Sequence, residues 1–323
     1  MAQKAKLRLS FVGTLTDRVA PLLDGTVEPE GIELVHTNSG MTEASWRVLK
    51  FQEFQVQELP ISCFFMAGSL GLDLVAIPVF PRRTFMHTGF QCHLESGIER
   101  PSDLAGKRVG MAEFQQTGSM WARGILEHDF GVSQFKVQWV EQAERLSHGA
   151  TFYTPPKGVS LERIPSSKNL SAMLVNHELD AARVGPPRNR ADREKVKPLF
   201  QDPVKEGIRF FSDHGFIPAN HIYAIRRDVY EEYPWVALNL YNAFVKAKEI
   251  ARGTLDDRIP TDMVFGSEYM QQTRDIFGDD PFPYGFNPNE KMLQSCVEFC
   301  QEQGLANTTE SLESHFASVT LEL

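Results

Sequence analysis

The sequence predicts a two-lobed α/β protein in which each lobe is a mostly parallel sheet flanked by helices. Three observations support this fold class. The chain has 323 residues, which exceeds what one hydrophobic core usually supports. Strand-like and helix-like segments alternate from the N-terminus, the pattern of a parallel sheet covered on both faces. Hydrophobic residues make up 42% of the chain and charged residues 23%, as in an ordinary globular protein.

The first lobe is expected to use segments from both ends of the chain. Residues 7–12 alternate between apolar and polar side chains, as a half-buried strand does. The apolar run 221–225 is expected to return to this lobe as a strand, and residues 234–251 have the apolar spacing of a long helix. The other expected elements are strands at 32–35, 54–59 and 74–79, and helices at 17–23, 61–70 and 42–52, the last one capped by Thr42.

The second lobe is expected to cover residues 91–216, which leaves residues 1–90 and 217–323 to the first lobe. An extended run over 85–94 leads into it. Residues 144–168 contain several glycines and prolines, so we expect a long surface excursion there. The other expected elements are a strand ending at Met111, strands at 137–140 and 180–184, and helices at 121–128 and 170–176.

Composition restricts the possible partners. The formal net charge of −9 argues against nucleic acid, because phosphate binding needs a dominant basic surface. A local arginine cluster can still bind a small anion.

The first residues lack a signal-peptide core, and no stretch reaches the roughly 18 apolar residues of a membrane helix, so we expect a cytoplasmic protein with no membrane partner. Residues 281–323 could cap a ligand or form a subunit contact, which leaves a homo-oligomer open.

Several common cofactor motifs are missing from the sequence. There is no His-Glu-x-x-His, no Gly-x-Gly-x-x-Gly, no Walker loop and no Gly-x-Ser-x-Gly. The cysteines lie at positions 63, 92, 296 and 300, without Cys-x-x-Cys spacing, and are interpreted as buried small residues. We therefore expect neither a metal nor an organic cofactor.

Four turns are candidates for binding a ligand. They are 13–16, 60–62, 115–117 and 185–187, and each follows an expected strand. In open α/β sheets, ligands bind outside the carboxyl ends of the strands, where helix N-termini present free N–H groups. Two of the turns belong to each expected lobe, so a cleft between the lobes would gather them around one carboxylate-bearing small molecule. Thr14 and Ser62 are the candidate side chains of the first two turns.

The segment 81–87 combines arginine with histidine. Adjacent guanidinium groups of Arg82 and Arg83 could bind a carboxylate through paired hydrogen bonds, and His87 could transfer a proton. The alternative is that the two arginines point to opposite faces of an extended chain and that His87 is a packed polar residue. The sequence leaves both interpretations open.

Polar side chains also gather where the second lobe's first strand meets its helix. Glu113, Gln115, Gln116 and Thr117 follow one another closely there, which suits the orientation of a polar ligand. The alternative is simple helix capping by Thr117, with exposed glutamines. Both interpretations carry equal weight.

One further histidine and two arginines complete the set of candidates. His221 lies in an apolar run, where a lone histidine is more often a hydrogen-bonded core residue than a catalyst. Arg183 and Arg188 flank the glycine-proline turn at 185–187 and are the members of the basic stretch that could reach a ligand. The rest of that stretch is interleaved with acidic residues and is expected to be solvated.

Several short motifs occur together along the chain. They are Pro29-Glu30-Gly31-Ile32, Phe51-Gln52-Glu53-Phe54 with Glu58, Ile77-Pro78-Val79-Phe80-Pro81 with Arg83 and His87, Asp103-Leu104-Ala105-Gly106-Lys107-Arg108-Val109-Gly110, Trp121-Ala122-Arg123-Gly124-Ile125-Leu126, and His221 followed by Ile225-Arg226-Arg227-Asp228-Val229. The combination resembles the 4,5-dihydroxyphthalate decarboxylase family over about residues 7–250. This resemblance implies the type 2 periplasmic-binding-protein-like fold.

The resemblance also implies an activity, which is the cofactor-independent removal of one carboxylate from 4,5-dihydroxyphthalate to give protocatechuate in aromatic catabolism. It implies roles as well: His87 or His221 as acid and base, Arg83 and Arg123 as carboxylate anchors, and Gln115 and Thr117 as orienting groups. Glu113 would orient a histidine or accept a phenol proton. The full set of expected substrate-binding residues is Arg82, Arg83, Thr14, Ser62, Gln115, Gln116, Thr117, Arg123, Arg183 and Arg188.

Three loops depart from the family's pattern. The turn after the first strand is Thr14-Leu15-Thr16-Asp17-Arg18 in place of a Tyr-Asp-Arg-Thr-like turn, the serine-rich turn is Pro60-Ile61-Ser62-Cys63, and Gly185 replaces an expected arginine. A related aromatic or heteroaromatic acid therefore stays open as the substrate. A transporter-type solute-binding protein for a small organic anion is the alternative function, and a biosynthetic enzyme acting on another carboxylate is a third. The fold cannot separate these functions.

Overall fold

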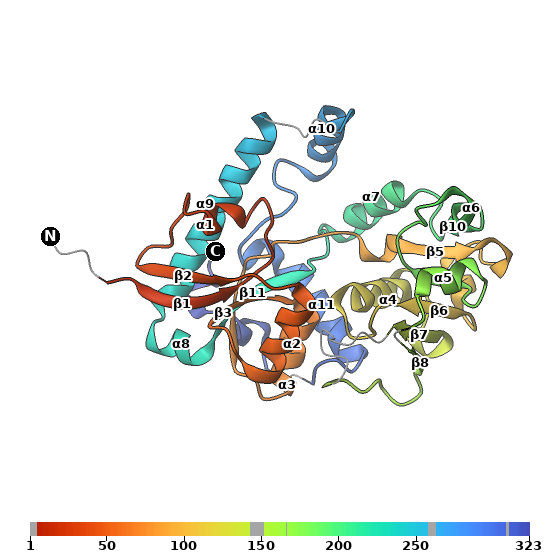
Figure 1. Cartoon of the computed structure of the whole chain (residues 1–323), viewed down its shortest axis with the longest axis horizontal. Coiled ribbons are helices and arrows are strands. Elements are labelled where there is room, and N and C mark those ends of the chain that lie inside the picture. Colours follow the sequence, from red (N-terminus) through yellow and green to blue (C-terminus); the bar gives the residue numbers. More distant parts are fainter. Residues whose placement is uncertain (1–4, 143–151, 166, 258–262, 308–309) are drawn as a thin grey trace. The chain divides into compact units, whose positions relative to one another are not determined.

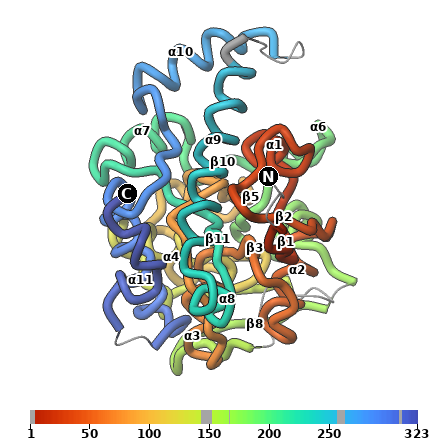
Figure 2. Tube along the Cα trace, turned by 90° about the vertical axis from the view of Figure 1, so that its left-hand side faces the viewer, coloured from red at the N-terminus to blue at the C-terminus, as the bar shows by residue number. Residues whose placement is uncertain are grey.

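The computed structural model describes residues 5–142, 152–165, 167–257, 263–307 and 310–323. The chain divides into two compact units, each built from separated segments (Figures 1 and 2). Unit 1 comprises Met1–Arg83, Ala219–Gln294 and Thr309–Leu323, and unit 2 comprises Thr84–Pro218 and Ser295–Thr308. Each unit contains its own sheet.

The sheet of unit 1 has the strand order β2-β1-β3-β11-β4. Within the described residues, β11 is its antiparallel member, because it pairs antiparallel with both β3 and β4, whereas β1 pairs parallel with β2 and β3. β11 therefore fills the gap between two strands of the N-terminal segment. The strands are β1 (Leu7–Val12), β2 (Ile32–Thr37), β3 (Val56–Pro60), β4 (Leu74–Ile77) and β11 (His221–Arg226).

Helices cover both faces of this sheet (Figure 1). On one face, Phe11, Tyr223 and Phe244 pack in one apolar core with residues of the first and ninth helices. On the other face lies the third helix, whose residues Ile61 to Ala67 are all buried, as its almost continuous apolar sequence predicts. The helices are α1 (Ala20–Leu23), α2 (Met41–Phe51), α3 (Ile61–Ser69), α8 (Arg227–Glu232), α9 (Trp235–Asp257) and α10 (Gly266–Phe277).

The sheet of unit 2 has the strand order β10-β5-β9-β6-β7-β8. In the described part, β5 is its antiparallel strand, and β6 pairs parallel with β7 and β9. The strands are β5 (Phe90–His93), β6 (Arg108–Met111), β7 (Gln138–Gln142), β8 (Ser160–Ile164), β9 (Ala181–Arg183) and β10 (Val196–Pro198), and the helices are α4 (Thr117–Phe130), α5 (Leu170–Val175), α6 (Arg190–Arg193) and α7 (Pro203–His214).

One helix passes from unit 1 into unit 2, and short 3-10 turns link other elements. The helix is α11 (Glu290–Glu302). The 3-10 turns are η1 (Met86–Gly89), η2 (Leu94–Ser96), η3 (Pro101–Leu104), η4 (Gln134–Lys136), η6 (Asn287–Asn289), η7 (Leu312–His315) and η8 (Ser318–Thr320).

The unit boundaries differ from the expected ones in the C-terminal segment. Residues 295–308 were expected in the first lobe but belong to unit 2. The reason is their packing: the Phe299 ring lies edge-on to Trp121 at 5.4 Å, and it lies so close to Gly124 that a Cβ there would collide with it. Gln303 accepts a hydrogen bond from Arg123 at 2.5 Å. Such distant partners leave no local signal in the sequence.

Three details of the expected elements are wrong. The helix at 42–52 is α2, which begins after Gly40, and Thr42 lies inside it. The extended run over 85–94 is split into η1 and β5. The surface excursion over 144–168 contains the sheet strand β8, whose side chains are mostly exposed and so give little apolar alternation. Residues 143–151 and 166 of that stretch lie outside the described residues.

None of the described helices combines the length and the apolarity that crossing a bilayer requires. The four cysteines are buried, as expected, and none of them is in a disulfide.

Candidate functional site

In each sheet the direction of strand addition reverses at one strand, and ligands bind at such switch points. In unit 1, β1 lies between β2 and β3, so the carboxyl ends of β1 and β3 flank the switch point. The turns 13–16 and 60–62 follow these two strands. β11 runs antiparallel and pairs His221 with Pro60, which places His221 at the same edge.

A histidine–glutamate pair occupies this edge. Nδ1 of His221 and Oε1 of Glu58 form a very short hydrogen bond. Glu58 is 0% exposed and His221 is 5% exposed. Among the described residues, none hydrogen-bonds to Nε2 of His221. The ring is therefore anchored through one nitrogen and leaves the other for a further partner.

Two further donors hold Glu58 as a carboxylate. The backbone N–H of Thr14 donates to Oε2 at 2.6 Å, and the Tyr223 hydroxyl donates to the same oxygen at 3.4 Å. Burial alone would raise the pKa of Glu58, but the hydrogen bonds from His221 and Thr14 and the charge of Arg82 lower it below its ordinary value. Burial and the Glu58 charge raise the pKa of Tyr223 well above its ordinary value, so Tyr223 stays a neutral donor.

The turn after β1 fits closely around this pair. A Cβ at Gly13 would lie 2.8 Å from the Tyr223 hydroxyl oxygen and 2.9 Å from the Phe11 ring, so this position excludes a side chain. The Thr14 hydroxyl is buried and has no hydrogen-bond partner among the described residues. It is a polar group available to a ligand at this edge.

The other predicted site residues of unit 1 are Arg82, Arg83 and Ser62, and their environments differ. Arg82 is exposed, and its charge acts on Glu58. Arg83 is buried and donates from Nη2 to the Pro283 carbonyl at 2.8 Å and to the Asn289 side chain. Burial lowers the pKa of Arg83 to about 10. Its guanidinium thus holds the 283–289 loop, while Ser62 is buried in the first turn of α3.

The switch point of unit 2 lies at β6, which has β9 on one side and β7 on the other. Arg183 ends β9 and donates from Nη2 to the side-chain oxygen of Gln116 at 3.0 Å. Its guanidinium lies against Gly118 in the first turn of α4, where a Cβ would be 2.8 Å from Nη2. A fixed positive charge therefore lies beside the free N–H groups of a helix N-terminus, an arrangement suited to an anion.

Hollows flank Arg183 on two sides. One, of about 280 Å³, is lined by Arg183, Gly185, Gln142 and residues 169–171. The other, of about 510 Å³, is lined by Arg183, Gly185, Gln91 and residues 88–89, among others. Burial lowers the pKa of Arg183 to about 10, so it keeps its charge at neutral pH. Each hollow could hold a small carboxylate.

The remaining predicted residues of this turn are buried. Gln115 donates a short hydrogen bond to the carboxylate of Glu113, and both side chains are buried. Thr117 is the first residue of α4 and is also buried. The cap residue of α4 is Gln116, whose own side chain accepts from Arg183, so helix capping by Thr117 is wrong.

The environment of His87 is that of a packed polar side chain. His87 is 0% exposed, and its Nε2 lies 2.9 Å from Oε1 of Glu206. The rings of Phe200 and Phe210 lie 5.6 and 5.3 Å from the imidazole. Glu206 also accepts from Arg209 at 2.7 Å. The structure favours the packed alternative for His87 over the catalytic one.

The two other predicted arginines of unit 2 differ in exposure. Arg123 is 1% exposed, lies 3.4 Å from the centre of the Phe114 ring and donates to Gln303. Burial lowers its pKa to about 9. Arg188 is exposed and lines a separate hollow of about 330 Å³ with residues 171–172 and 175–176, among others. Arg123 thus holds the 295–308 segment in place.

Two clusters in the described part of unit 2 have the donor atoms to hold a metal ion. They are His93 with Glu95 and His177, and His128 with Glu298 and Glu302. Neither contains a residue predicted for the site.

The comparisons with known proteins agree with this architecture. Over 316 residues the chain is 30% identical to a 4,5-dihydroxyphthalate decarboxylase from Comamonas testosteroni, and the match covers 94% of each chain. The chain belongs to the 4,5-dihydroxyphthalate decarboxylase family. Another such decarboxylase, from Pseudomonas putida, is 34% identical over 206 residues, which cover 61% of this chain and 79% of that relative. No protein-family model matches the chain.

Solved structures similar to this family member include both binding proteins and an enzyme. The periplasmic aliphatic sulphonate binding protein SsuA from Escherichia coli matches with a TM-score of 0.56 and 13% identity, over 99% of this chain and 100% of that one. The desulfurization enzyme DSZB matches with a TM-score of 0.54 and 14% identity, over 97% and 96% of the two chains. The two-lobed, periplasmic-binding-protein-like fold predicted from the sequence is confirmed.

Sequence reasoning identified His221 but missed its partner in this decarboxylase family member. Glu58 was noted as part of a motif and not as a site residue, and Tyr223 was expected only as part of a strand. The available signal was a glutamate within an expected strand of the sheet, where a buried carboxylate needs a hydrogen-bonded or charged partner. Finding that partner requires the β3–β11 register.

Proposed function

We propose that the protein decarboxylates 4,5-dihydroxyphthalate, or a close aromatic analogue, and that His221 transfers the proton. The His221–Glu58 pair carries this proposal, because it joins a buried carboxylate of lowered pKa to an imidazole with a nitrogen left for substrate. Membership of the 4,5-dihydroxyphthalate decarboxylase family supports the substrate.

The lowered pKa of Glu58 determines the direction of its hydrogen bond with His221. An ionised carboxylate only accepts, so Nδ1 of His221 carries a hydrogen and donates it to Glu58. When the ring is protonated, Nε2 carries the second proton and faces away from Glu58. The pair therefore presents an N–H at Nε2 as a general acid.

The proton transfer that this pair supports balances without an added cofactor. Each carboxylate of 4,5-dihydroxyphthalate is para to a hydroxyl group. Nε2 of His221 donates its proton to the ring carbon that bears the carboxylate, and the para oxygen stabilises the resulting cation. The bond to the carboxylate then breaks, its electron pair restores the aromatic ring, and CO2 leaves. The imidazole regains a proton from solvent.

Carboxylate binding is the second requirement, and for unit 2 we propose Arg183 as an anchor. Its guanidinium is charged, held by Gln116 and flanked by two hollows. A planar guanidinium can bind a carboxylate through two parallel hydrogen bonds. Thr14, Ser62, Arg82, Glu113, Gln115 and Thr117 stay predictions as further site residues.

Cellular context belongs to the same proposal. We propose a cytoplasmic enzyme of aromatic catabolism that needs no organic cofactor and no metal ion. The four cysteines are buried and none is in a disulfide, which is compatible with a reducing compartment. A solute-binding protein remains the alternative, since the same fold occurs in SsuA and in DSZB.

A product assay tests the proposal. The purified protein is incubated with 4,5-dihydroxyphthalate, with and without a chelator, while CO2 and protocatechuate are measured. We expect equimolar CO2 and protocatechuate in both conditions, and we expect Glu58→Gln to lower the rate because a neutral amide cannot stabilise the imidazolium. Tight binding of the substrate without any CO2 would instead support the solute-binding alternative.

A further inference from the structure

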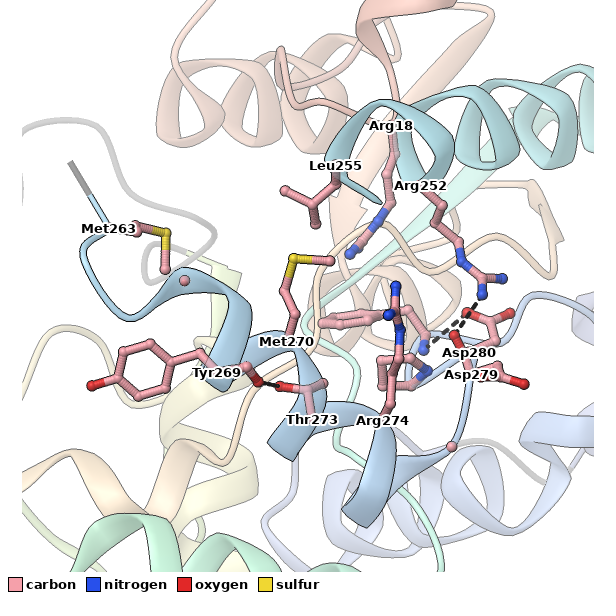
Figure 3. A pocket seen from close by; sticks show the side chains of 14 residues that line it. Arg18, Arg252, Leu255, Met263, Tyr269, Met270, Thr273, Arg274, Asp279 and Asp280 are labelled. Carbon is pink, nitrogen blue, oxygen red and sulfur yellow. Dashed lines mark hydrogen bonds between the residues drawn. The ribbon is translucent and has the colours of Figure 1, made fainter. Parts of the chain in front are cut away.

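A pocket of about 300 Å³ lies in unit 1, between the end of α9, the length of α10 and the loop that follows α10 (Figure 3). In Figure 2, α9 (teal) leads to α10 (blue) at one end of the trace. Arg18, from the loop after β1, closes the remaining side. The pocket shares no lining residue with the His221–Glu58 pair.

The walls of the pocket are largely apolar. Leu255 from α9 and Met270 from α10 point into the same space (Figure 3), and Phe282 also lines the pocket. Leu255, Met263 and Tyr269 are 40%, 48% and 57% exposed. These large apolar side chains line a concave space, and a ligand there would remove them from water.

Cationic groups lie at one end of this apolar space. Arg18 donates from Nη1 to the Pro81 carbonyl at 3.0 Å, and its guanidinium lies 4.0 Å from the centre of the Phe282 ring. Arg252 donates from Nη2 to the Asp279 carbonyl at 2.6 Å. Each guanidinium is thus fixed by a neutral carbonyl, which orients it without neutralising its charge.

The charge balance of the pocket is positive. Within the described chain, no carboxylate forms an ion pair with Arg18 or Arg252. Asp280 also lines the pocket, but its carboxylate pairs with Lys248 at 2.6 Å. Asp279 is the other carboxylate that lines the pocket beside Arg18 and Arg252, in a protein whose net charge is −9.

We propose that this pocket binds an organic anion with an apolar body. The head group would lie against Arg18 and Arg252, where it gains two charge-assisted hydrogen-bond donors. The body would lie on Leu255, Met270 and Phe282. A volume of about 300 Å³ accommodates one small ligand, either an aromatic carboxylate or a medium-chain fatty acid. This site goes beyond the proposed function, because it involves none of the residues assigned to decarboxylation.

Calorimetric titration of the full chain with decanoate and with 2-naphthoate tests this site and distinguishes its two ligand sources. Decanol at the same concentration serves as the uncharged probe. We expect one binding event per chain for at least one anion, weakened by salt, and none for decanol. Absence of saturable binding by both anions would overturn the proposal.

Matched variants locate the binding event. Arg252→Gln and Leu255→Asp are expected to weaken binding about 10-fold or more, since removing a charged hydrogen bond costs roughly 1.5–3 kcal/mol and each 1.4 kcal/mol is tenfold. Leu255 is 40% exposed, so its replacement leaves the core intact. Arg8→Gln, at an exposed arginine of β1 outside the pocket, should bind as the parent does. Equal effects of Arg8→Gln and Arg252→Gln would mean a diffuse charge effect and would overturn the site.

Two controls separate this site from the decarboxylation site and from subunit contacts. His221→Gln should retain anion binding even though we expect it to lose turnover. The anion-binding proposal and the decarboxylation proposal can therefore fail independently of each other. Sedimentation velocity of Leu255→Asp should match that of the parent. A change in its oligomeric state together with unchanged anion binding would show that the apolar walls form a subunit contact instead.

Discussion

Each unit contains a histidine hydrogen-bonded to a glutamate, yet the two pairs differ in their surroundings. His221 is bonded through Nδ1, at the carboxyl edge of the unit 1 sheet, and its Nε2 has no partner among the described residues. His87 is bonded through Nε2 to Glu206 and lies among phenylalanine rings. The His–Glu contact alone therefore does not indicate catalysis. Nδ1 of His87 also has no hydrogen-bond partner among the described residues, but it is buried, so the position of His221 at a switch point is what distinguishes the two.

The glutamates differ as well. Glu206 shares its carboxylate with Arg209, which also pairs with Asp129 at 2.6 Å, so His87 is part of a network that links α7 to α4. Glu58 instead accepts from the Thr14 N–H and the Tyr223 hydroxyl. Burial opposes ionisation of both glutamates, and their hydrogen bonds nevertheless lower both pKa values. The His87–Glu206 pair belongs to a charged network within unit 2, and the His221–Glu58 pair is the one that we propose acts on the substrate.

Replacement of His221 by glutamine tests this contrast most strongly. His221→Gln removes the proposed general acid, and we expect kcat for 4,5-dihydroxyphthalate to fall by about 10²–10⁴-fold, the usual contribution of such a group. Steady-state CO2 release measures the change, with circular dichroism to check the fold. His315→Gln, at another histidine of unit 1, should leave kcat unaltered. Full activity of His221→Gln would refute the assigned role.

Removal of the proposed carboxylate anchor should have the next largest effect. For Arg183→Gln we expect KM to rise roughly 10–100-fold with a smaller change in kcat, because a charge-assisted hydrogen bond contributes about 1.5–3 kcal/mol. Arg183→Lys should recover part of the loss, since it keeps the charge but not the planar geometry. An unaltered KM in both variants would mean that the carboxylate binds elsewhere.

His87→Gln should affect stability and not catalysis. We expect the free energy of unfolding to fall by about 1–3 kcal/mol, because a buried, charge-assisted hydrogen bond and aromatic packing are disturbed. Urea denaturation measures this loss. Turnover per folded molecule should stay within about twofold of the parent value. A large loss of kcat without loss of stability would assign the catalytic role to His87 after all.

The pH dependence of stability should reveal the charge of Glu58. Its pKa in the folded protein lies below the ordinary value of 4.5, so the ionised form favours folding. This contribution is complete above pH 4.5 and is lost as the pH falls through the folded-state pKa. We therefore expect the melting temperatures of the parent and of Glu58→Gln to converge below pH 4.5. A constant difference down to pH 3.5 would contradict an ionised Glu58.

The smallest effect is expected at the neighbouring exposed arginine. Arg188→Gln should change KM by less than about twofold, because surface charges away from a bound ligand contribute little. This variant is the matched control for Arg183→Gln, in the same unit and with the same loss of charge. If both variants raised KM equally, the overall electrostatic potential of unit 2 would explain the effect, and Arg183 would not be a specific anchor.

The sequence predicted the buried elements well and the half-exposed ones poorly. The strand at 7–12 and the helix at 61–70 are apolar enough to be recognised without tertiary information. The amphipathic helix α7 and the edge strand β8 were missed. In β8 most side chains are exposed, so alternation between apolar and polar residues, the main signal for a strand, is absent there.

Site residues follow the same division. The four turns were predicted as candidate ligand-binding turns because each follows a recognisable strand, and this stays a prediction. Which side chains are accessible depended on partners far away in the sequence: Glu206 lies 119 residues from His87, and Gln303 lies 180 residues from Arg123. Local patterns contain no information on such contacts, so the sequence could not decide between the packed and the catalytic interpretation of His87, and it did not indicate the burial of Arg123.

The place of β11 in the unit 1 sheet has a consequence for biosynthesis. β3 and β4 are separated in the sheet by a strand that the ribosome produces about 150 residues later. Until His221–Arg226 emerges, both strands present unpaired edges, which are templates for association with other chains. Completion of unit 1 is therefore delayed until most of the chain has been translated. We expect a nascent chain halted near residue 215 to require a chaperone, and one released near residue 260 to need it far less.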